Sequence, residues 1–198
     1  AKSVGGVVGL GGGSSMDVAK LLALLLGSDQ KLSDMYGIGM CQGERLPLAL
    51  VPTTAGTGSE ATPISIVTTG ASEKKGVVSP QLLPDWAVLD ADLTLGLPKH
   101  ITAATGIDAM VHAIEAYTSK VKKNPISDLL AKEALRLLGA NIQTVCENSN
   151  ARQARSDMLL GSMLAGMAFS NAPVAAVHAL AYPLGGHFHV PHGLSNSL

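Results

Sequence analysis

The sequence is poor in aromatic residues and nearly balanced in charge. Aromatic side chains make up 3% of its 198 residues, and the formal net charge is −1. Lysine and arginine form no cluster interleaved with aromatic residues, which argues against a nucleic-acid-binding protein. The two cysteines, Cys41 and Cys146, stand apart without CxxC spacing. They exclude a disulfide framework and predict a reducing compartment, so we expect a cytoplasmic protein.

Long hydrophobic runs are also scarce, with one exception. Residues 158–177 are uncharged over 20 residues, a length that could cross a bilayer. Ser170, Asn171 and Pro173 interrupt this run, and a histidine follows it directly. We therefore expect two buried helices broken near residues 170–173 and no membrane span. The first residues do not resemble a signal peptide, and an apolar fraction of 46% excludes a disordered chain.

The first half of the chain alternates short apolar runs with glycine-rich turns. We expect strands at residues 4–10, 46–51, 64–69 and 86–90, a polar turn at residues 71–76, and a helix over residues 17–26 capped by Ser14 or Ser15. Beyond Pro98 the pattern is helical, with helices expected at residues 101–119, 127–145, 152–168 and 173–181. The sequence thus predicts an α/β nucleotide-binding portion with an incomplete parallel sheet in residues 1–97, followed by an all-helical metal-binding portion in residues 98–198.

Two loops rich in glycine or hydroxyl groups follow predicted strands. Gly11, Gly12 and Gly13 would let the backbone approach a pyrophosphate, and the next helix would point its first amides at it. The spacing is not that of the GxGxxG fingerprint, so these glycines alone are equally typical of a plain tight turn. The second loop, residues 53–59, carries four hydroxyl side chains and two glycines. Because parallel sheets bind ligands at the carboxyl ends of their strands, this second loop favours a nucleotide site.

Two clusters of residues predict a metal site. Asp108 and His112 are spaced i and i+4, so a helix would place both on one face; alone, they could equally be a surface capping pair. His178 and His192 belong to a second cluster, in which four of the six histidines fall within 15 residues. One carboxylate and neutral imidazoles suit a catalytic divalent cation with an open position. Glu115 could orient a ligand imidazole or form an ordinary salt bridge. A nucleotide site and a metal site together indicate hydride transfer to or from an alcohol.

Five ordered motifs resemble a known family. They are GGGSSMDVAK, PTTAGTGSEAT, LDADLTLGLP, AATGIDAMVHAIEAY and HALAYPLGGHFHVPHG. In this order they resemble the iron-containing (group III) alcohol dehydrogenases, which have the dehydroquinate-synthase-like fold. The resemblance runs from about Val7 to Ser197. It implies a catalytic metal, usually Fe²⁺ and sometimes Zn²⁺, held by Asp108, His112, His178 and His192.

The same resemblance implies a bound dinucleotide, NAD or NADP. The residues that match its pyrophosphate turn are Gly12, Gly13 and Ser14. Those that match its nicotinamide-side loop are Thr53, Thr54 and Thr57. Further cofactor contacts are implied for Lys75, with Lys74 as the alternative alignment, and for Leu93.

The chain departs from the family pattern in one residue and in length. Many members have a histidine four residues after the ligand that matches His178, where this chain has Tyr182. A phenol, with a pKa of about 10, is a poorer base at neutral pH, so proton transfer is expected through the cofactor ribose, Tyr182 or His187. Family members are roughly twice this length, and we expect this chain to be the middle of a longer protein. The preceding segment would hold the group that distinguishes NAD from NADP.

The resemblance therefore implies a metal-dependent alcohol dehydrogenase that transfers a hydride reversibly between an alcohol and NAD(P). Its expected partners are a small alcohol or aldehyde and, in the complete protein, further copies of itself. Neither a nucleic acid nor a membrane is expected. The alternatives are a polyol dehydrogenase or a cyclising synthase of the same fold, or a truncated, non-catalytic fragment.

Overall fold

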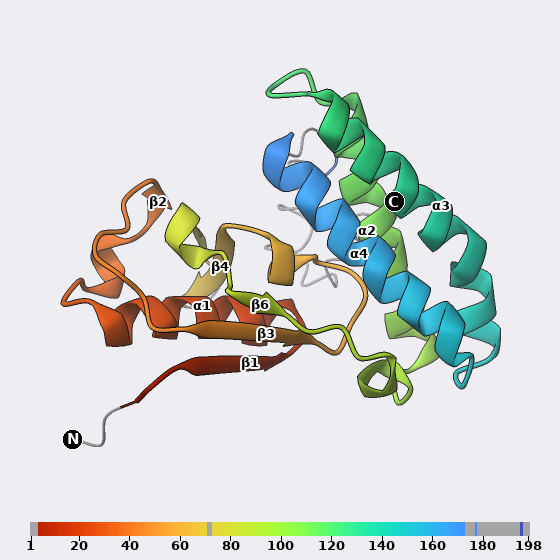
Figure 1. Cartoon of the computed structure of the whole chain (residues 1–198), viewed down its shortest axis with the longest axis horizontal. Helices are drawn as coiled ribbons and strands as arrows, with labels where there is room; N and C mark the ends of the chain where they lie inside the picture. The colour runs from red at the N-terminus through yellow and green to blue at the C-terminus, as the bar shows by residue number, and fades with distance from the viewer. Residues whose placement is uncertain (1–3, 71–72, 173–176, 178–194, 196–198) are drawn as a thin grey trace. The chain divides into compact units, whose positions relative to one another are not determined.

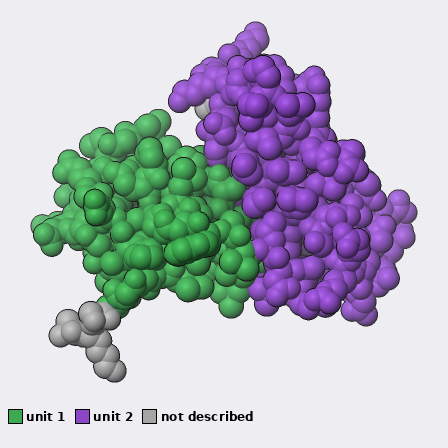
Figure 2. All heavy atoms as spheres, in the orientation of Figure 1, with its two compact units in different colours: residues 1–52, 59–88 green, residues 53–58, 89–198 purple. Residues whose placement is uncertain are grey.

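The computed structural model describes residues 4–70, 73–172, 177 and 195. These residues form two compact units, which Figure 2 distinguishes by colour. Unit 1 comprises Ala1–Pro52 and Ser59–Val88, and unit 2 comprises Thr53–Gly58 and Leu89–Leu198. The chain therefore runs from unit 1 into unit 2 at residue 53, returns to unit 1 at residue 59, and enters unit 2 again at residue 89. The division into functional domains at residue 97 stays a prediction.

Unit 1 contains a three-stranded parallel sheet with the strand order β1-β3-β6. Its strands are β1 (Val7–Gly11), β3 (Leu48–Pro52) and β6 (Trp86–Ala87). Helix α1 (Gly13–Gly27) follows β1 and packs on β1 and β3 (Figure 1). The packing is close, because a Cβ atom at Gly9 would lie 2.7 Å from the Ala19 Cβ. The core beneath the helix is formed by Met16, Ala19, Ala23, Leu48 and Leu50.

A second small sheet in unit 1 has the strand order β2-β5-β4. Its strands are β2 (Gly37–Ile38), β4 (Ile64–Thr69) and β5 (Glu73–Val78), with β4 and β5 antiparallel and β2 parallel to β5. The expected polar turn at residues 71–76 is therefore wrong beyond residue 72. Glu73 and Lys74 are exposed, so the charges that indicated a turn belong to the solvent-facing end of a strand. Val77, on the same strand, is fully buried.

Unit 2 is a bundle of three long helices that pack on one another (Figure 1). They are α2 (Lys99–Thr118), α3 (Pro125–Glu147) and α4 (Arg152–Asn171). Small residues lie where the helices meet, which lets their axes approach closely: a Cβ atom at Gly161 would lie 2.9 Å from the Leu138 side chain. Asn124 begins α3 by accepting hydrogen bonds from the amides of Ile126 and Ser127, with Pro125 in the first turn.

Among the described residues, four short 3₁₀ helices connect the larger elements. They are η1 (Leu32–Asp34), η2 (Ser59–Ala61), η3 (Pro80–Leu82) and η4 (Ala91–Thr94).

The predicted fold class is confirmed: an α/β region with small parallel strands precedes a bundle of three long helices. The expected N-cap of the first helix is wrong, because α1 begins at Gly13 with Gly12 as its cap. Glycine gives no side-chain cap signal, so the hydroxyl residues place the predicted boundary too late. The strand expected at residues 86–90 is only two residues long. The helix expected at residues 173–181 lies outside the described residues except for Val177. Helix α4 ends at Asn171, within the break expected at residues 170–173. In the part that is described, no helix is long and apolar enough to span a membrane.

Candidate functional site

The glycine turn joins β1 to α1 in a geometry that only glycine adopts without strain. Gly11 has φ of 146°, and a Cβ atom there would lie 2.6 Å from the Ser15 hydroxyl. The Ser15 and Met16 amides donate to the Gly12 carbonyl. Among the described residues no side chain caps this end of α1, so its first amides are open to an acceptor. Of the predicted cofactor residues, Gly12 caps α1 and Gly13 and Ser14 are its first two residues, a position that fits a phosphate group chemically.

The threonine loop, Thr53–Gly58, packs against the helices of unit 2. A Cβ atom at Gly56 would lie 2.8 Å from the Thr105 Cβ on α2, and one at Gly58 would lie 2.7 Å from the Gly166 Cα on α4. Gly58 also has φ of 58°. Its two glycines are therefore required by packing, and they hold the backbone of the loop in one conformation. The predicted contact residues Thr53, Thr54 and Thr57 on this loop are half-buried.

Asp108 and His112 lie one turn apart on α2 and are 2% and 6% exposed. The His112 ring stacks on Phe169 of α4, with ring centroids 4.7 Å apart. Glu115, also buried, accepts a hydrogen bond of 2.7 Å from the backbone amide of Val177. Val177 directly precedes His178 in the sequence, so Glu115 binds the residue before the second histidine cluster.

The predicted site residues divide between the two units and the part of the chain outside the description. Gly12, Gly13, Ser14 and Lys75 belong to unit 1; Thr53, Thr54, Thr57, Leu93, Asp108 and His112 belong to unit 2. His178, Tyr182, His187 and His192 lie outside the described residues. Within those residues, no group of three or more His, Cys, Asp or Glu side chains could hold a metal ion.

The two less certain cofactor residues occupy different environments. Lys75 lies on β5, with its Nζ 3.5 Å from a Glu73 carboxylate oxygen and 5.2 Å from the centre of the Tyr36 ring. Leu93 lies on η4 and is exposed. Their roles stay predictions.

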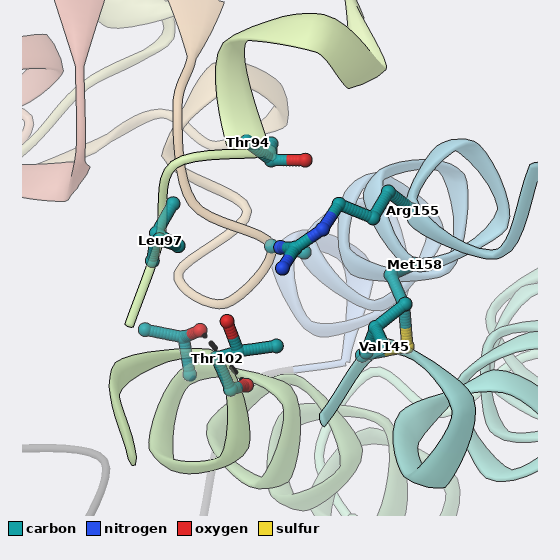
Figure 3. Close-up of a pocket in the computed structure, with 8 residues that line it drawn as sticks. Thr94, Leu97, Thr102, Val145, Arg155 and Met158 are labelled. Carbon is teal, nitrogen blue, oxygen red and sulfur yellow. Dashed lines mark hydrogen bonds between the residues drawn. The ribbon is translucent and has the colours of Figure 1, made fainter. Parts of the chain in front are cut away.

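A separate, small pocket lies within unit 2 (Figure 3). Arg155 reaches into it from α4 toward Thr102 on α2, although the arginine is only 4% exposed. Its Nε donates to the Ser149 carbonyl at 2.8 Å, and burial lowers the pKa of the guanidinium. The buried Thr102 hydroxyl has no hydrogen-bond partner among the described residues. The other lining residues are Ala55, Thr94, Leu97, Thr105, Val145 and Met158. None of the predicted site residues lines this pocket.

Two buried cations, Lys20 and Arg155, are not singled out by the sequence pattern. Lys20 is fully buried on α1. Its signal is a single charge inside the otherwise apolar run from Val18 to Leu26. A lone charge in such a run is more often solvated at the helix surface, so the pattern does not distinguish a buried lysine from an exposed one.

Comparison with known proteins gives one consistent result. The model of the Fe-containing alcohol dehydrogenase family, C-terminal, matches residues 102–198, and that of iron-containing alcohol dehydrogenase matches residues 1–91. Long-chain-alcohol dehydrogenase 1 of Geobacillus thermodenitrificans is 49% identical over 195 residues, which cover 97% of this chain and 49% of that protein.

Solved structures agree with the sequence relatives. The crystal structure of a 1,3-propanediol oxidoreductase superimposes with a TM-score of 0.91 at 40% identity, over 96% of this chain and 50% of that one. Sulfoacetaldehyde reductase from Bifidobacterium kashiwanohense, solved in complex with NAD⁺, gives a TM-score of 0.90 at 36% identity, over 97% and 51%. The chain spans about half the length of the relatives it matches.

Proposed function

Because this chain belongs to the iron-containing alcohol dehydrogenase family, we propose that it forms part of an NAD(P)-dependent and metal-dependent alcohol dehydrogenase. The reaction is the reversible transfer of a hydride between a small alcohol or aldehyde and the cofactor. The observation that carries the proposal is the buried pair Asp108 and His112, one turn apart on α2.

The donor set of this pair fits a divalent cation. A carboxylate and a neutral imidazole one turn apart on a helix are both common ligands of divalent cations. Fe²⁺ and Zn²⁺ both accept this combination of ligands. Glu115 supports the proposal by holding the amide of Val177, and we propose that His178 and His192 complete the set.

The glycine turn and the threonine loop are the proposed cofactor-binding elements. The open amides at the start of α1 suit a pyrophosphate, and the half-buried threonines offer hydroxyl donors and acceptors to a nicotinamide amide. Lys75 and Leu93 are proposed as further cofactor contacts. The cofactor is NAD or NADP, because the glycine turn recognises the pyrophosphate, which the two dinucleotides share.

The chemistry divides between the bound groups and the chain. When bound, the cation lowers the pKa of the alcohol and the nicotinamide accepts the hydride. Asp108 and His112 would hold the cation, the glycine turn would hold the pyrophosphate, and the threonine loop would hold the nicotinamide. The proton that leaves the alcohol passes to the cofactor ribose, Tyr182 or His187. A cytoplasmic location fits the two free cysteines. By the resemblance to the family, we also propose that the complete protein forms a homo-oligomer.

Anaerobic titration of the metal-stripped protein with Fe²⁺ and with Zn²⁺ tests the metal site. Bound metal and thermal unfolding are followed together in the wild type, Asp108→Asn, His112→Gln and the control His100→Gln, an exposed histidine on the same helix. We expect one metal per chain in the wild type and the control. Both site variants should lose more than about 100-fold in affinity, since outer groups alone cost about 10–100-fold.

Metal affinity that is unchanged in Asp108→Asn and His112→Gln would overturn the ligand assignment. If the wild type binds one metal, NADH formation on a panel of primary alcohols and diols follows. Net NADH or NADPH from simple alcohols supports a dehydrogenase, whereas the absence of both favours a cyclising synthase or a non-catalytic fragment. Repeating the titration on a chain extended to the length of its relatives distinguishes a wrong ligand set from a site that needs flanking segments.

A further inference from the structure

Helix α1 carries a lysine that is completely enclosed by protein. Lys20 has no exposed surface, and its ammonium group donates three hydrogen bonds, to the Thr62 carbonyl at 2.9 Å, the Thr62 hydroxyl at 3.2 Å and the Ile64 carbonyl at 2.7 Å. A lysine ammonium has three donors, and here every one has an acceptor. Burial lowers the pKa of Lys20 to about 8.

Asp17, one turn earlier on α1, extends the same contact. Its carboxylate accepts hydrogen bonds from the Ser59 hydroxyl at 2.6 Å and from the Ile66 amide at 2.9 Å. The Ser65 hydroxyl donates to the backbone carbonyl of Asp17 at 3.0 Å. The carboxylate also lies 3.8 Å from the ammonium of Lys20. We name these contacts between Asp17, Lys20 and residues 59–66 the Lys20 network.

The Lys20 network lies next to the glycine turn, which the proposed function assigns to the pyrophosphate of the dinucleotide. Its helix side follows this turn, since Asp17 and Lys20 are the fifth and eighth residues of α1, which begins at Gly13. Its other side begins at Ser59, the residue directly after the threonine loop. Within unit 1, the network therefore fixes residues 59–66 against the helix that the glycine turn opens.

Charged groups are an expensive way to pack a helix against a strand. Burying an ammonium and a carboxylate removes both from water, and apolar residues of similar volume would usually be at least as stabilising. The charges make the contact specific in geometry, because the three N–H groups of Lys20 and the two carboxylate oxygens of Asp17 each need a hydrogen-bond partner at a defined position. Such a contact permits one register between α1 and residues 59–66, whereas an apolar contact tolerates small shifts.

We propose that Lys20, together with Asp17, is a positioning residue for the dinucleotide site. It holds the helix that follows the glycine turn in one register against residues 59–66, so that the pyrophosphate of the cofactor meets a preformed turn. This inference rests on the proposed function and extends it to two residues outside the proposed cofactor contacts.

Lys20→Met tests the role, because methionine fills a similar volume without the donors. Leu24→Ala is the matched control: Leu24 is also fully buried on α1, and its side chain has no hydrogen-bonding group. Dissociation constants for NAD⁺ and NADP⁺, metal affinity, the melting temperature and hydrogen exchange over residues 59–66 are measured in each.

In Lys20→Met we expect about tenfold weaker dinucleotide binding, as preorganisation is lost, and faster exchange at residues 59–66. Metal affinity should stay at the wild-type value. Leu24→Ala should lower the melting temperature without weakening dinucleotide binding. If Lys20→Met does not fold, Asp17→Asn gives the same comparison, because it removes the charge and one acceptor of the network.

Wild-type dinucleotide affinity in Lys20→Met would overturn the inference, and so would an equal loss of affinity in Leu24→Ala, because the role would then be general stability. A wild-type chain extended to the length of its relatives that binds neither dinucleotide overturns the proposed function itself. The two failures are distinguishable, since the first leaves wild-type binding intact.

Discussion

Two glycines in the helical bundle should respond in opposite directions to the same substitution. Gly166 on α4 faces the threonine loop, and a Cβ atom there would lie 2.6 Å from the Gly58 carbonyl oxygen and 2.9 Å from the Gly58 Cα. Gly139 on α3 is exposed, and a Cβ atom there would meet nothing within 4 Å. Both glycines lie inside long helices, so backbone entropy favours alanine at each position by about 0.5–1 kcal/mol.

Gly139→Ala should therefore raise the free energy of unfolding by about 0.5–1 kcal/mol. In Gly166→Ala the same gain is opposed by overpacking, which typically costs about 1–3 kcal/mol. The obstruction is backbone on both sides, and Gly58 has the left-handed φ of 58°, so neither partner can yield by changing a rotamer. We expect a net loss of up to about 2 kcal/mol, or several degrees in melting temperature.

Urea unfolding followed by circular dichroism measures both variants, and the difference between them cancels the shared helix-propensity gain. Gly166→Ala should also weaken dinucleotide binding if the threonine loop contacts the cofactor. If Gly166→Ala stabilises the protein as much as Gly139→Ala does, the close approach of Gly58 and Gly166 is not a feature of the folded chain and the reasoning fails.

Three further predictions concern buried or paired carboxylates. Glu115→Ala should weaken metal binding about 10–100-fold by calorimetry, with Glu115→Gln closer to the wild type because its amide oxygen can still accept from Val177; equal losses in both would refute this. Burial raises the pKa of Glu60 to about 7, so its contribution to stability is present at low pH and is lost as the pH rises through 7. Glu60→Gln should therefore flatten the dependence of the free energy of unfolding on pH between pH 5 and 7. An unchanged slope would contradict the raised pKa of Glu60. Hydrogen bonds from Arg45 and the Leu48 amide lower the pKa of Asp85 to about 2. Asp85→Asn should therefore lower the free energy of unfolding at pH 7, and this loss should shrink as the pH falls through 2. A loss that does not change with pH would contradict the lowered pKa.

The elements that could be predicted are those whose signal lies within a few consecutive residues. Strands β1, β3 and β4 are short apolar runs bounded by glycine, proline or a turn, and the three long helices have helical patterning over many residues. The spacing of Asp108 and His112 needed only the helical period to predict a shared face, and the structure places both on α2.

What could not be predicted depends on atoms distant in the sequence. Strand β5 exists because its backbone pairs with β4 and β2, while its first residues are as polar as a turn. The acceptors of Lys20 are the carbonyls of Thr62 and Ile64 and one hydroxyl. Backbone carbonyls are present at every residue, so no sequence pattern marks the ones that a buried cation will use.

The interleaving of the two units has a consequence for how the chain is made. Residues 53–58 leave the ribosome long before α2 and α4, the helices against which Gly56 and Gly58 pack. During synthesis, the threonine loop therefore lacks the helices that it packs against until residue 166 has emerged from the ribosome. A chain that ended at residue 88 would contain both sheets and α1, and it would keep the loop but lose these supports permanently. Independent expression of the first unit should thus yield a folded sheet with an unsupported loop, and co-expression with residues 89–198 should restore its order.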